Sequence, residues 1–164
     1  MSILILTGPA GAGKNTVATI LARKKSKCAV IDVDAVRHMI VQPHHAPWSG
    51  NEGKEQVRLG IKNACMMAKN FLAENFDVVI LDVVTDWSLN LYKEYFQGKI
   101  FKVALLLPSL EEVKKRNQSR EYRLEEKRVL ELYDQQSKFS SFDTKIDNTK
   151  TTPETVAEEL KQIF

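Results

Sequence analysis

Cysteine is scarce in this sequence of 164 residues, and what there is shows no metal-binding pattern. The two cysteines, Cys28 and Cys65, have neither C-x-x-C spacing nor a histidine at ligand spacing. Both fall in apolar segments that we expect to be buried. We therefore interpret them as reduced thiols of the core and assign them no chemistry.

Long apolar runs are absent as well. The first apolar run, Ile3 to Leu6, covers only a few residues and leads directly into a glycine-rich turn, so it fits neither a signal peptide nor a membrane span. With 7 glycines, 5 prolines, 43% hydrophobic and 27% charged residues, the composition is that of a soluble α/β protein. We predict a single domain over residues 1–164, located in the cytoplasm and without a membrane partner.

A large excess of one charge is also missing. The formal charge is +3, and the basic residues concentrate at 23–27 and 114–128 without forming a continuous stripe. Proteins that bind duplex nucleic acid usually carry such a stripe, so the sequence disfavours a nucleic acid partner.

Short apolar runs alternate with amphipathic segments along the whole chain. Residues 3–7, for example, form the continuous apolar run that is typical of a parallel strand buried on both faces. The pattern predicts strands at 3–7, 28–32, 76–84, 100–107 and 144–146, and helices at 14–24, 33–41, 55–75, 88–96, 110–119, 124–139 and 153–163. This alternation predicts a three-layer α/β/α fold around a five-stranded parallel sheet.

The strongest motif is a phosphate-binding pattern, G-x-x-x-x-G-K, which follows a predicted strand and precedes a predicted helix: Gly8-Pro9-Ala10-Gly11-Ala12-Gly13-Lys14. Its glycines let main-chain N–H groups surround a phosphate, the helix adds partial positive charge, and Lys14 reaches the β and γ phosphates.

The residue after the lysine departs from this pattern. A hydroxyl residue that binds Mg²⁺ usually stands there, whereas this chain has Asn15, with Thr16 one place later. An amide oxygen can bind Mg²⁺ directly or through water, with a less compact geometry. Thr16 either serves the α phosphate or bonds the backbone of its own helix.

Taken together, the chain resembles the small P-loop kinases, a group with nucleoside monophosphate, shikimate and gluconate kinases, chloramphenicol phosphotransferase and 5′-hydroxyl polynucleotide kinases. More narrowly, it is similar to short kinase-like AAA family ATPases in these segments: Ile31-Asp32-Val33-Asp34, Ala46-Pro47-Trp48, Val79-Ile80-Leu81-Asp82 with Trp87, Arg116 with Arg120, and Ile146-Asp147-Asn148-Thr149. The resemblance implies a P-loop NTPase fold with nucleoside-monophosphate-kinase-like topology. It also implies ATP and Mg²⁺ as cofactors and a monomer or homodimer.

An acidic pair follows the second predicted strand. By resemblance, a carboxylate at this place takes the proton from the acceptor hydroxyl, which makes Asp34 the first candidate for a general base and Asp32 the second. In an alternative interpretation Asp34 is the N-cap of the next helix. Arg37 is a candidate to hold an anionic acceptor, with a solvated helix residue as the alternative.

Asp82 ends the most apolar predicted strand, where a buried carboxylate needs a cation or hydrogen-bond donors. This position suits Mg²⁺ binding through water, and we predict a metal site that comprises Asn15 and Asp82. Two alternatives are a contact between Asp82 and the acceptor and a structural hydrogen bond to the phosphate loop.

Arg116, Arg120 and Arg123 are spaced so that a continuing helix would present them on one face. Such a cluster fits a lid over residues 116–128 that closes over ATP and neutralises the transferred phosphate. The alternative is a basic helix that faces solvent. Three further basic side chains are assigned to that solvent-facing side: Lys114, Lys115 and Arg128. By resemblance, Arg116 or Arg120 borders the adenine.

Two further segments complete the predicted site. Asn148 and Thr149 belong, by resemblance, to a stretch whose backbone contacts the base. Residues 41–53 are rich in histidine, proline and glycine and long for a plain connection, so we predict a loop that covers the acceptor. Within this loop, Trp48 either packs on the long helix or stacks on a substrate.

These parts favour a phosphotransferase that moves the γ-phosphate of ATP to a hydroxyl or phosphate of a small-molecule acceptor. One alternative is a kinase for the 5′ hydroxyl of a polynucleotide, which would need a basic channel lined by aromatic rings. Another is a non-catalytic nucleotide-binding module or weak ATPase, for which Asn15 is the main argument. Catalytic roles are predicted for Lys14, Asp34, Arg116 and Arg120.

Overall fold

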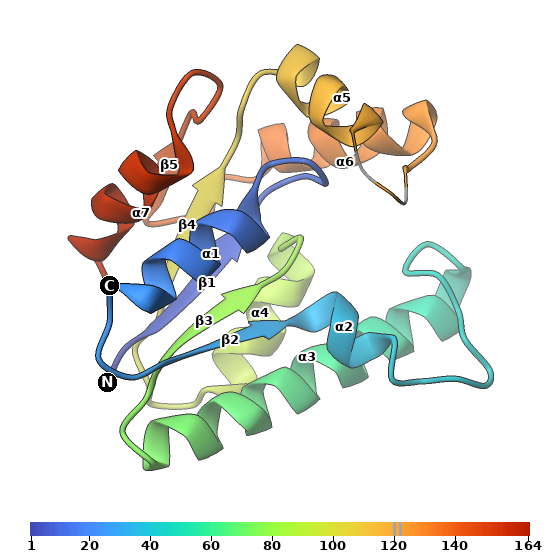
Figure 1. Cartoon of the computed structure of the whole chain (residues 1–164). Helices are drawn as coiled ribbons and strands as arrows, with labels where there is room; N and C mark the ends of the chain where they lie inside the picture. The colour runs from blue at the N-terminus through green and yellow to red at the C-terminus, as the bar shows by residue number, and fades with distance from the viewer. Residues whose placement is uncertain (120, 122) are drawn as a thin grey trace.

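A parallel sheet forms the centre of the molecule, with helices against both of its faces (Figure 1). The computed structural model describes residues 1–119, 121 and 123–164. Its strands are β1 (Ile3–Thr7), β2 (Cys28–Asp32), β3 (Asp77–Leu81), β4 (Lys102–Leu106) and β5 (Thr144–Ile146). They lie in the order β2-β3-β1-β4-β5, and each adjacent pair is parallel. The predicted fold class is thus confirmed.

The three central strands, β1, β3 and β4, are buried and apolar over nearly their whole length, as suits a sheet with helices on both faces. The helices are α1 (Lys14–Arg23), α2 (Val33–Arg37), α3 (Gly50–Ala73), α4 (Asp86–Tyr95), α5 (Leu110–Gln118), α6 (Glu126–Lys138) and α7 (Pro153–Lys161). In β1, Ile3 and Ile5 join the cluster formed with α3 and α4, whereas Leu4 and Leu6 join the cluster formed with α1 and α7. This alternation follows from the two-residue period of a strand.

The chain between α2 and α3 differs from its prediction at both ends. Helix α2 ends at Arg37, several residues before the predicted end. Helix α3 begins at Gly50, so part of the predicted 41–53 loop is helical. A Cβ at Gly53 would lie 2.1 Å from the carbonyl oxygen of Ala46, so glycine there lets the loop fold back onto the first turn of α3. The glycine that suggested a loop therefore serves helix packing.

The carboxyl ends of three neighbouring strands meet at one edge of the sheet. In the register of the sheet, Leu81 of β3 pairs with Leu6 of β1 on one side and with Asp32 of β2 on the other. The glycine-rich loop, Asp32 and Asp82 therefore emerge side by side, at the edge where parallel sheets place their ligands.

Helix α6 is fastened to this edge by a buried polar network. The Gln136 amide nitrogen donates to the Val84 carbonyl at 2.7 Å, and the Thr7 hydroxyl donates to the Gln136 amide oxygen at 2.8 Å. The same hydroxyl accepts from the Val84 N–H at 2.8 Å. Thr7 and Gln136 are fully buried, so this network fixes the second half of α6 against β1.

Both cysteines are free thiols, as predicted. Burial raises the pKa of Cys28 to about 11 and that of Cys65 to about 12, so neither thiol ionises near neutral pH. Among the described residues, no helix combines the length and apolarity needed to cross a bilayer.

Candidate functional site

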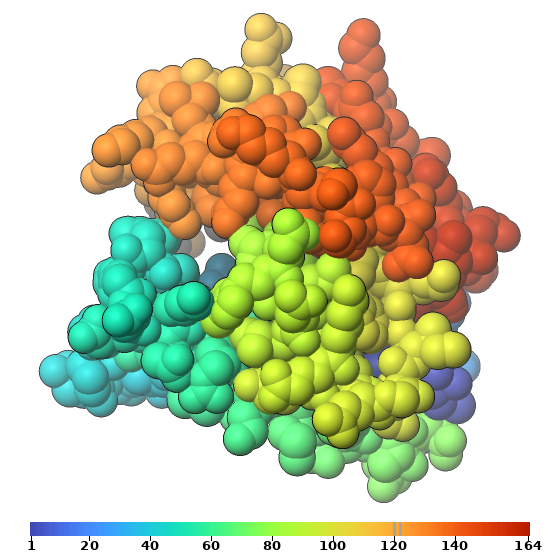
Figure 2. Space-filling view, turned by 180° about the vertical axis from the view of Figure 1, so that it is seen from behind, coloured from blue at the N-terminus to red at the C-terminus, as the bar shows by residue number. Residues whose placement is uncertain are grey.

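A cavity of about 1390 Å³ opens above the carboxyl edge of the sheet. Its wall comes from the glycine-rich loop, α2, the start of α3, the β3–α4 segment and the α5–α6 region. From behind, the molecule is hollowed between the start of α3 and α6 (Figure 2). The predicted site residues that line it are Ala10, Gly11, Ala12, Gly13, Lys14, Asn15, Thr16, Asp32, Asp34, Arg37, Trp48, Asp82 and Arg116. The topology therefore brings most of the predicted site together.

The glycine-rich loop has the backbone of a phosphate cradle. Gly8, Gly11 and Gly13 all have positive φ values, of 149°, 86° and 90°. A Cβ at Gly8 would lie 2.3 Å from the Leu106 carbonyl oxygen, so no other residue fits there without a backbone shift. The Lys14 ammonium donates to the carbonyls of Gly8 at 2.7 Å and Pro9 at 3.2 Å, which holds it over the loop.

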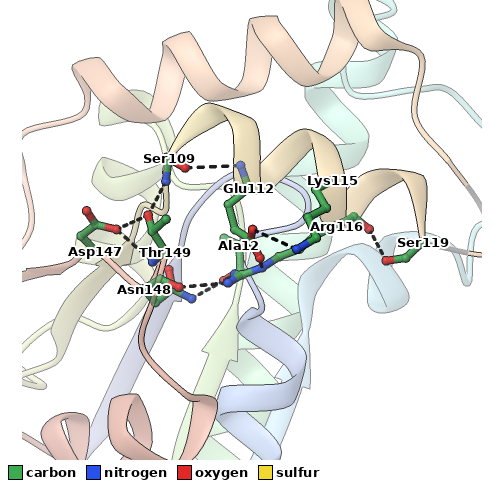
Figure 3. A network of polar contacts seen from close by, with 9 residues as sticks. All are labelled: Ala12, Ser109, Glu112, Lys115, Arg116, Ser119, Asp147, Asn148 and Thr149. Atoms are coloured by element: carbon green, nitrogen blue, oxygen red, sulfur yellow. Dashed lines mark hydrogen bonds and ion pairs between the residues drawn. The ribbon is translucent and has the colours of Figure 1, made fainter.

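The loop is fixed from outside through the carbonyl of Ala12 (Figure 3). The Asn148 side-chain amide donates to this oxygen at 2.8 Å, and an Arg116 N–H donates to it at 3.4 Å. Arg116 also donates to the Asn148 carbonyl at 2.9 Å and to Glu112 at 2.8 Å. With the Ala12 carbonyl bonded on this side, the loop is held in shape before a ligand arrives.

Asn148 and Thr149 lie behind the loop, outside the wall of the cavity. The Thr149 hydroxyl accepts from the Ser109 N–H at 2.7 Å, and the Thr149 N–H donates to Asp147 at 2.9 Å. The Thr149 side chain thus connects the segment after β5 to the start of α5, whereas the Asn148 side chain contacts the phosphate loop. The contact of their backbone with a base stays a prediction.

Asn15 takes part in a contact that a serine could not make in the same way. Its amide nitrogen donates to the Asp32 carboxylate at 3.1 Å, which leaves its oxygen as the atom available to a ligand. The other Asp32 oxygen accepts from the N–H groups of Asp34 and Ala35. Asp32 is therefore the N-cap of α2, and the alternative that gave this role to Asp34 is wrong.

Because Asp34 does not cap the helix, its carboxylate is exposed, and it forms an ion pair with Arg37 at 3.5 Å. Arg37 is only 4% exposed, so the alternative of a solvated helix residue is wrong. Its guanidinium donates to the His45 carbonyl at 3.0 Å and contacts the His38 ring nitrogen at 3.1 Å. These contacts hold Arg37 at the wall of the cavity beside the candidate base.

Asp82 is held by two donors, the Val83 N–H at 2.7 Å and the Tyr92 hydroxyl at 2.8 Å. These bonds do not run to the phosphate loop, as one alternative required. Burial raises the pKa of Asp82 from 3.8 to about 6, and the charge of Asp34 adds to the rise. The Tyr92 and Val83 donors and the Lys14 ammonium act in the opposite direction. The negative charges of Asp82 and Asp34 therefore interact across the cavity.

The residues present fit a magnesium ion that is bound mainly by phosphate oxygens and water. Within the described residues, no group of three or more His, Cys, Asp or Glu side chains could hold a metal by itself. Asn15 offers an amide oxygen and Asp82 a carboxylate on neighbouring segments. Such a small oxygen set suits Mg²⁺, which retains waters and binds together with nucleotide phosphates.

The predicted row of arginines is broken after Arg116. Helix α5 ends at Gln118, and the Asn117 side chain bonds both the N–H and the carbonyl of Leu124, at 3.1 and 2.9 Å, which folds the chain back. Arg123 is therefore exposed outside any helix, contrary to the prediction of one continuous face. The predicted site residue Arg120 lies outside the described residues.

Several residues of the cavity wall had no predicted role in the site, among them Lys54 and Trp87, and Arg128 was assigned to the wrong side. The Arg128 guanidinium carbon lies 4.2 Å from the ring centroid of Trp48, so its assignment to the solvent-facing side is wrong. Lys54 lies 4.9 Å from the ring centroid of Trp87. Leu132, buried one turn after Arg128 and also lining the cavity, is the sequence signal that could have placed Arg128 inward.

Trp48 does not pack into the core on the long helix, since it is 59% exposed and lies against Arg128 of α6. Its ring therefore stands at the wall of the cavity, between the loop that precedes α3 and the helix on the other side. Whether a substrate stacks on it stays a prediction.

The strand, phosphate loop and helix, set in a parallel sheet of this order, define a P-loop protein of the kinase-like type. The chain belongs to the AAA domain family, whose model matches residues 3–141. No curated protein matches the sequence.

Solved structures share this fold over nearly the whole chain. The tunicamycin resistance protein of Deinococcus radiodurans superposes with a TM-score of 0.75 at 16% identity, over 99% of this chain and 94% of that one. A sugar kinase from Janibacter sp. HTCC2649 gives 0.74 at 15%, over 99% and 93%. Shikimate kinase from Acinetobacter baumannii, in complex with shikimate, gives 0.63 at 19%, over 99% and 92%. At these identities the likeness shows the fold alone.

Proposed function

We propose that this protein is an ATP-dependent phosphotransferase that transfers the γ-phosphate to a hydroxyl or phosphate group of a small acceptor. The observation that carries the proposal is the placement of a phosphate cradle and two carboxylates at one edge of the sheet. Lys14 and Asp34 both lie close enough to Asp82 to shift its pKa. The groups proposed for phosphate binding, proton removal and metal contact all line one cavity, which supports the proposal.

Each part of the cavity has a role in this proposal. The loop amides and Lys14 bind the β and γ phosphates, and Arg116 secures the loop and adds positive charge beside it. Asn15 and Asp82 would hold Mg²⁺, which would supply positive charge to neutralise the phosphates. Asp34 is the candidate general base, because its carboxylate is exposed to the cavity and Arg37 orients it.

The transfer balances with these groups alone. The bond from the γ phosphorus to the bridging oxygen of ADP breaks as a bond to the acceptor oxygen forms. The proton of an acceptor hydroxyl passes to Asp34, and the bond electrons leave with ADP. Catalysis here consists of positioning and charge stabilisation, for which the cavity supplies both a cradle and a base.

The proposal is tested by incubating the protein with γ-labelled ATP, Mg²⁺ and a panel of nucleosides, nucleotides, sugars, antibiotics and 5′-hydroxyl oligonucleotides. We expect label on one class of small acceptor. Label on oligonucleotides alone would favour a polynucleotide kinase, and label released only as free phosphate would overturn transfer. Lys14→Ala should abolish ATP binding in calorimetry and so serves as the site control.

Asn15→Ser tests the non-catalytic alternative. The contact of Asn15 with Asp32 is the specific observation that favours it, because it ties the Asn15 amide group to a neighbouring side chain at the position where a metal ligand is expected. Higher Mg²⁺-dependent turnover in Asn15→Ser would mark the natural protein as a slow catalyst. Absence of turnover in both proteins, with ATP binding intact, would favour a nucleotide-binding module.

A further inference from the structure

The half of the cavity away from the phosphate loop is rich in basic side chains. Arg37, Lys54 and Arg128 reach it from three separate helices. Asp34 is paired with Arg37 at 3.5 Å and Glu131 with Arg128 at 2.9 Å, and Lys54 forms no ion pair among the described residues. One positive charge therefore remains uncompensated in this half, which favours an anionic ligand.

Both arginines of this set also have a side-chain N–H group that makes no hydrogen bond. Among buried side-chain nitrogen and oxygen atoms of the described residues, only three lack a hydrogen-bond partner, and two of them are the Nε atoms of Arg37 and Arg128. The Arg37 Nε faces the Asp34 carboxylate at 3.5 Å without making a hydrogen bond, and the Arg128 Nε likewise makes none, because the ion pair of Arg128 with Glu131 runs through its terminal nitrogen. Such groups on two arginines that line one cavity are explained if a ligand with several acceptor oxygens draws the guanidinium groups toward it.

The same half contains both tryptophans of the chain. Arg128 covers one face of Trp48 and Lys54 lies over the ring of Trp87, so each indole is coupled to one of the cations. Trp48 nevertheless keeps 59% of its surface exposed. An indole left open at the wall of a cavity offers a stacking surface for a flat ring.

Resting on the phosphotransferase function proposed above, we infer that the acceptor carries both an anionic group and a flat ring. Arg37, Lys54 and Arg128 hold the anion, and the ring stacks on Trp48 or Trp87. Nucleoside monophosphates and hydroxylated aromatic carboxylates share this chemistry. Both place a negative group and a planar ring within one small molecule, and the experiment distinguishes them.

Intrinsic fluorescence measures this binding without any turnover, because both tryptophans of the chain lie at the subsite. The protein is first saturated with a non-hydrolysable ATP analogue and Mg²⁺, so that probes cannot bind at the phosphate loop. The probes are the four common ribonucleoside monophosphates and 3- and 4-hydroxybenzoate. Nucleosides and ribose 5-phosphate serve as the separate halves of the nucleotides, and phenol and acetate as those of the hydroxybenzoates.

We expect one ring-bearing anion to bind at least tenfold more tightly than either of its halves. Tighter binding by a nucleoside monophosphate identifies a nucleotide acceptor, and tighter binding by a hydroxybenzoate identifies an aromatic acid. The inference is overturned if, at probe concentrations up to about 10 mM, no ring-bearing anion binds more tightly than its separate halves.

Variants assign the contacts. Lys54→Met should weaken the best probe about tenfold, and Arg37→Met by more, whereas Lys62→Met, exposed on the same helix as Lys54, should leave binding unchanged. Because Arg37 is buried, Arg37→Met is first checked for a cooperative thermal transition. If that variant does not fold, the assignment is tested with Lys54→Met alone. Unchanged binding in folded Lys54→Met would contradict the assignment. Trp48→Phe and Trp87→Phe show which ring reports the ligand.

The two proposals fail in different ways. A protein that binds a ring-bearing anion but transfers label to no acceptor of the panel would refute the phosphotransferase function and keep the subsite. A protein that transfers label only to neutral or cationic acceptors would refute the subsite and keep the function.

Discussion

The two ends of the cavity are built from different material. The nucleotide end is mainly main chain: a short glycine-rich loop whose shape is fixed by Gly8 and by the bonds to the Ala12 carbonyl. The end that we propose for the acceptor, termed the acceptor end, is made of side chains from five separate segments: Arg37, Trp48, Lys54, Trp87 and Arg128. A backbone site depends on a few glycines, whereas a side-chain site can change by substitution without a change of fold. This difference explains how one fold can serve many acceptors.

The largest effect is expected from Gly8→Ala, which distorts the phosphate loop at the nucleotide end. With φ at 149° and the Leu106 carbonyl oxygen 2.3 Å from the new Cβ, the loop must shift. Nucleotide affinity in calorimetry should fall by more than about a hundredfold, roughly 3 kcal/mol. Gly98→Ala is the matched control, since Gly98 also has a positive φ, of 74°, but nothing within 4 Å. Equal losses in both variants would show that the close contact is irrelevant.

Asp82→Asn tests how burial of this carboxylate, which lies between the two ends of the cavity, affects the free energy of unfolding at different pH values. The folded-state pKa of about 6 lies above the ordinary 3.8, so the folded protein binds this proton more tightly than the unfolded chain. The free energy of unfolding should therefore fall between pH 4 and pH 6 and level off above, by about 3 kcal/mol from this group. The variant should lack this fall and be more stable at pH 7.

Urea unfolding at a series of pH values, with magnesium chelated, measures this difference. The exposed Asp134→Asn should keep the slope of the natural protein. Parallel slopes in Asp82→Asn and the natural protein would contradict the account of a desolvated carboxylate.

Arg116→Gln sharpens the view of the nucleotide end, because it removes side-chain support while the loop sequence stays intact. The loss of its bonds to the carbonyls of Ala12 and Asn148 should lower nucleotide affinity about tenfold, or ~1–2 kcal/mol. Lys115→Gln, whose side chain is 80% exposed, should bind as the natural protein does. If Lys115→Gln reduced affinity equally, general charge and not loop support would be responsible.

The smallest effect is expected from Gly53→Ala, which acts on the acceptor end alone. Its Cβ would meet the Ala46 carbonyl at 2.1 Å and push the loop that carries Trp48 away from α3. The KM for the acceptor should rise roughly fivefold, equivalent to about 1 kcal/mol, with nucleotide affinity within a factor of two. Steady-state kinetics and calorimetry together decide this, and a matching loss of nucleotide affinity would refute the separation of the two ends.

The nucleotide end could be predicted from the sequence because its information is local. The loop motif, the strand before it and the helix after it are contiguous, and Ile3 to Thr7 are apolar enough to require two covered faces. The places of Asp32 and Asp82 could be predicted for the same reason, since Asp32 ends β2 and Asp82 directly follows β3 in one parallel sheet. Strand order then brought them together.

The acceptor end could not be predicted because its information is tertiary. Lys54 and Trp87 are 33 positions apart and meet only because α3 packs against α4. Arg128 stood among solvent-facing lysines and glutamates, and only the return of the chain at Asn117 turns it toward Trp48. The start of α3 was missed because Gly50 and Gly53 suggested a loop, when one begins the helix and the other admits the neighbouring chain.

The attachment of α6 through Gln136 limits how the roof of the cavity can move. Breaking that fully buried amide from both Thr7 and Val84 would leave several polar groups unpaired, so sliding of the helix along its axis is costly. A tilt about Gln136 keeps these bonds, and it moves the amino end of α6 most. Arg128 lies about two helical turns before Gln136, so such a tilt would move it farther than residues near Gln136 and would separate it from Trp48.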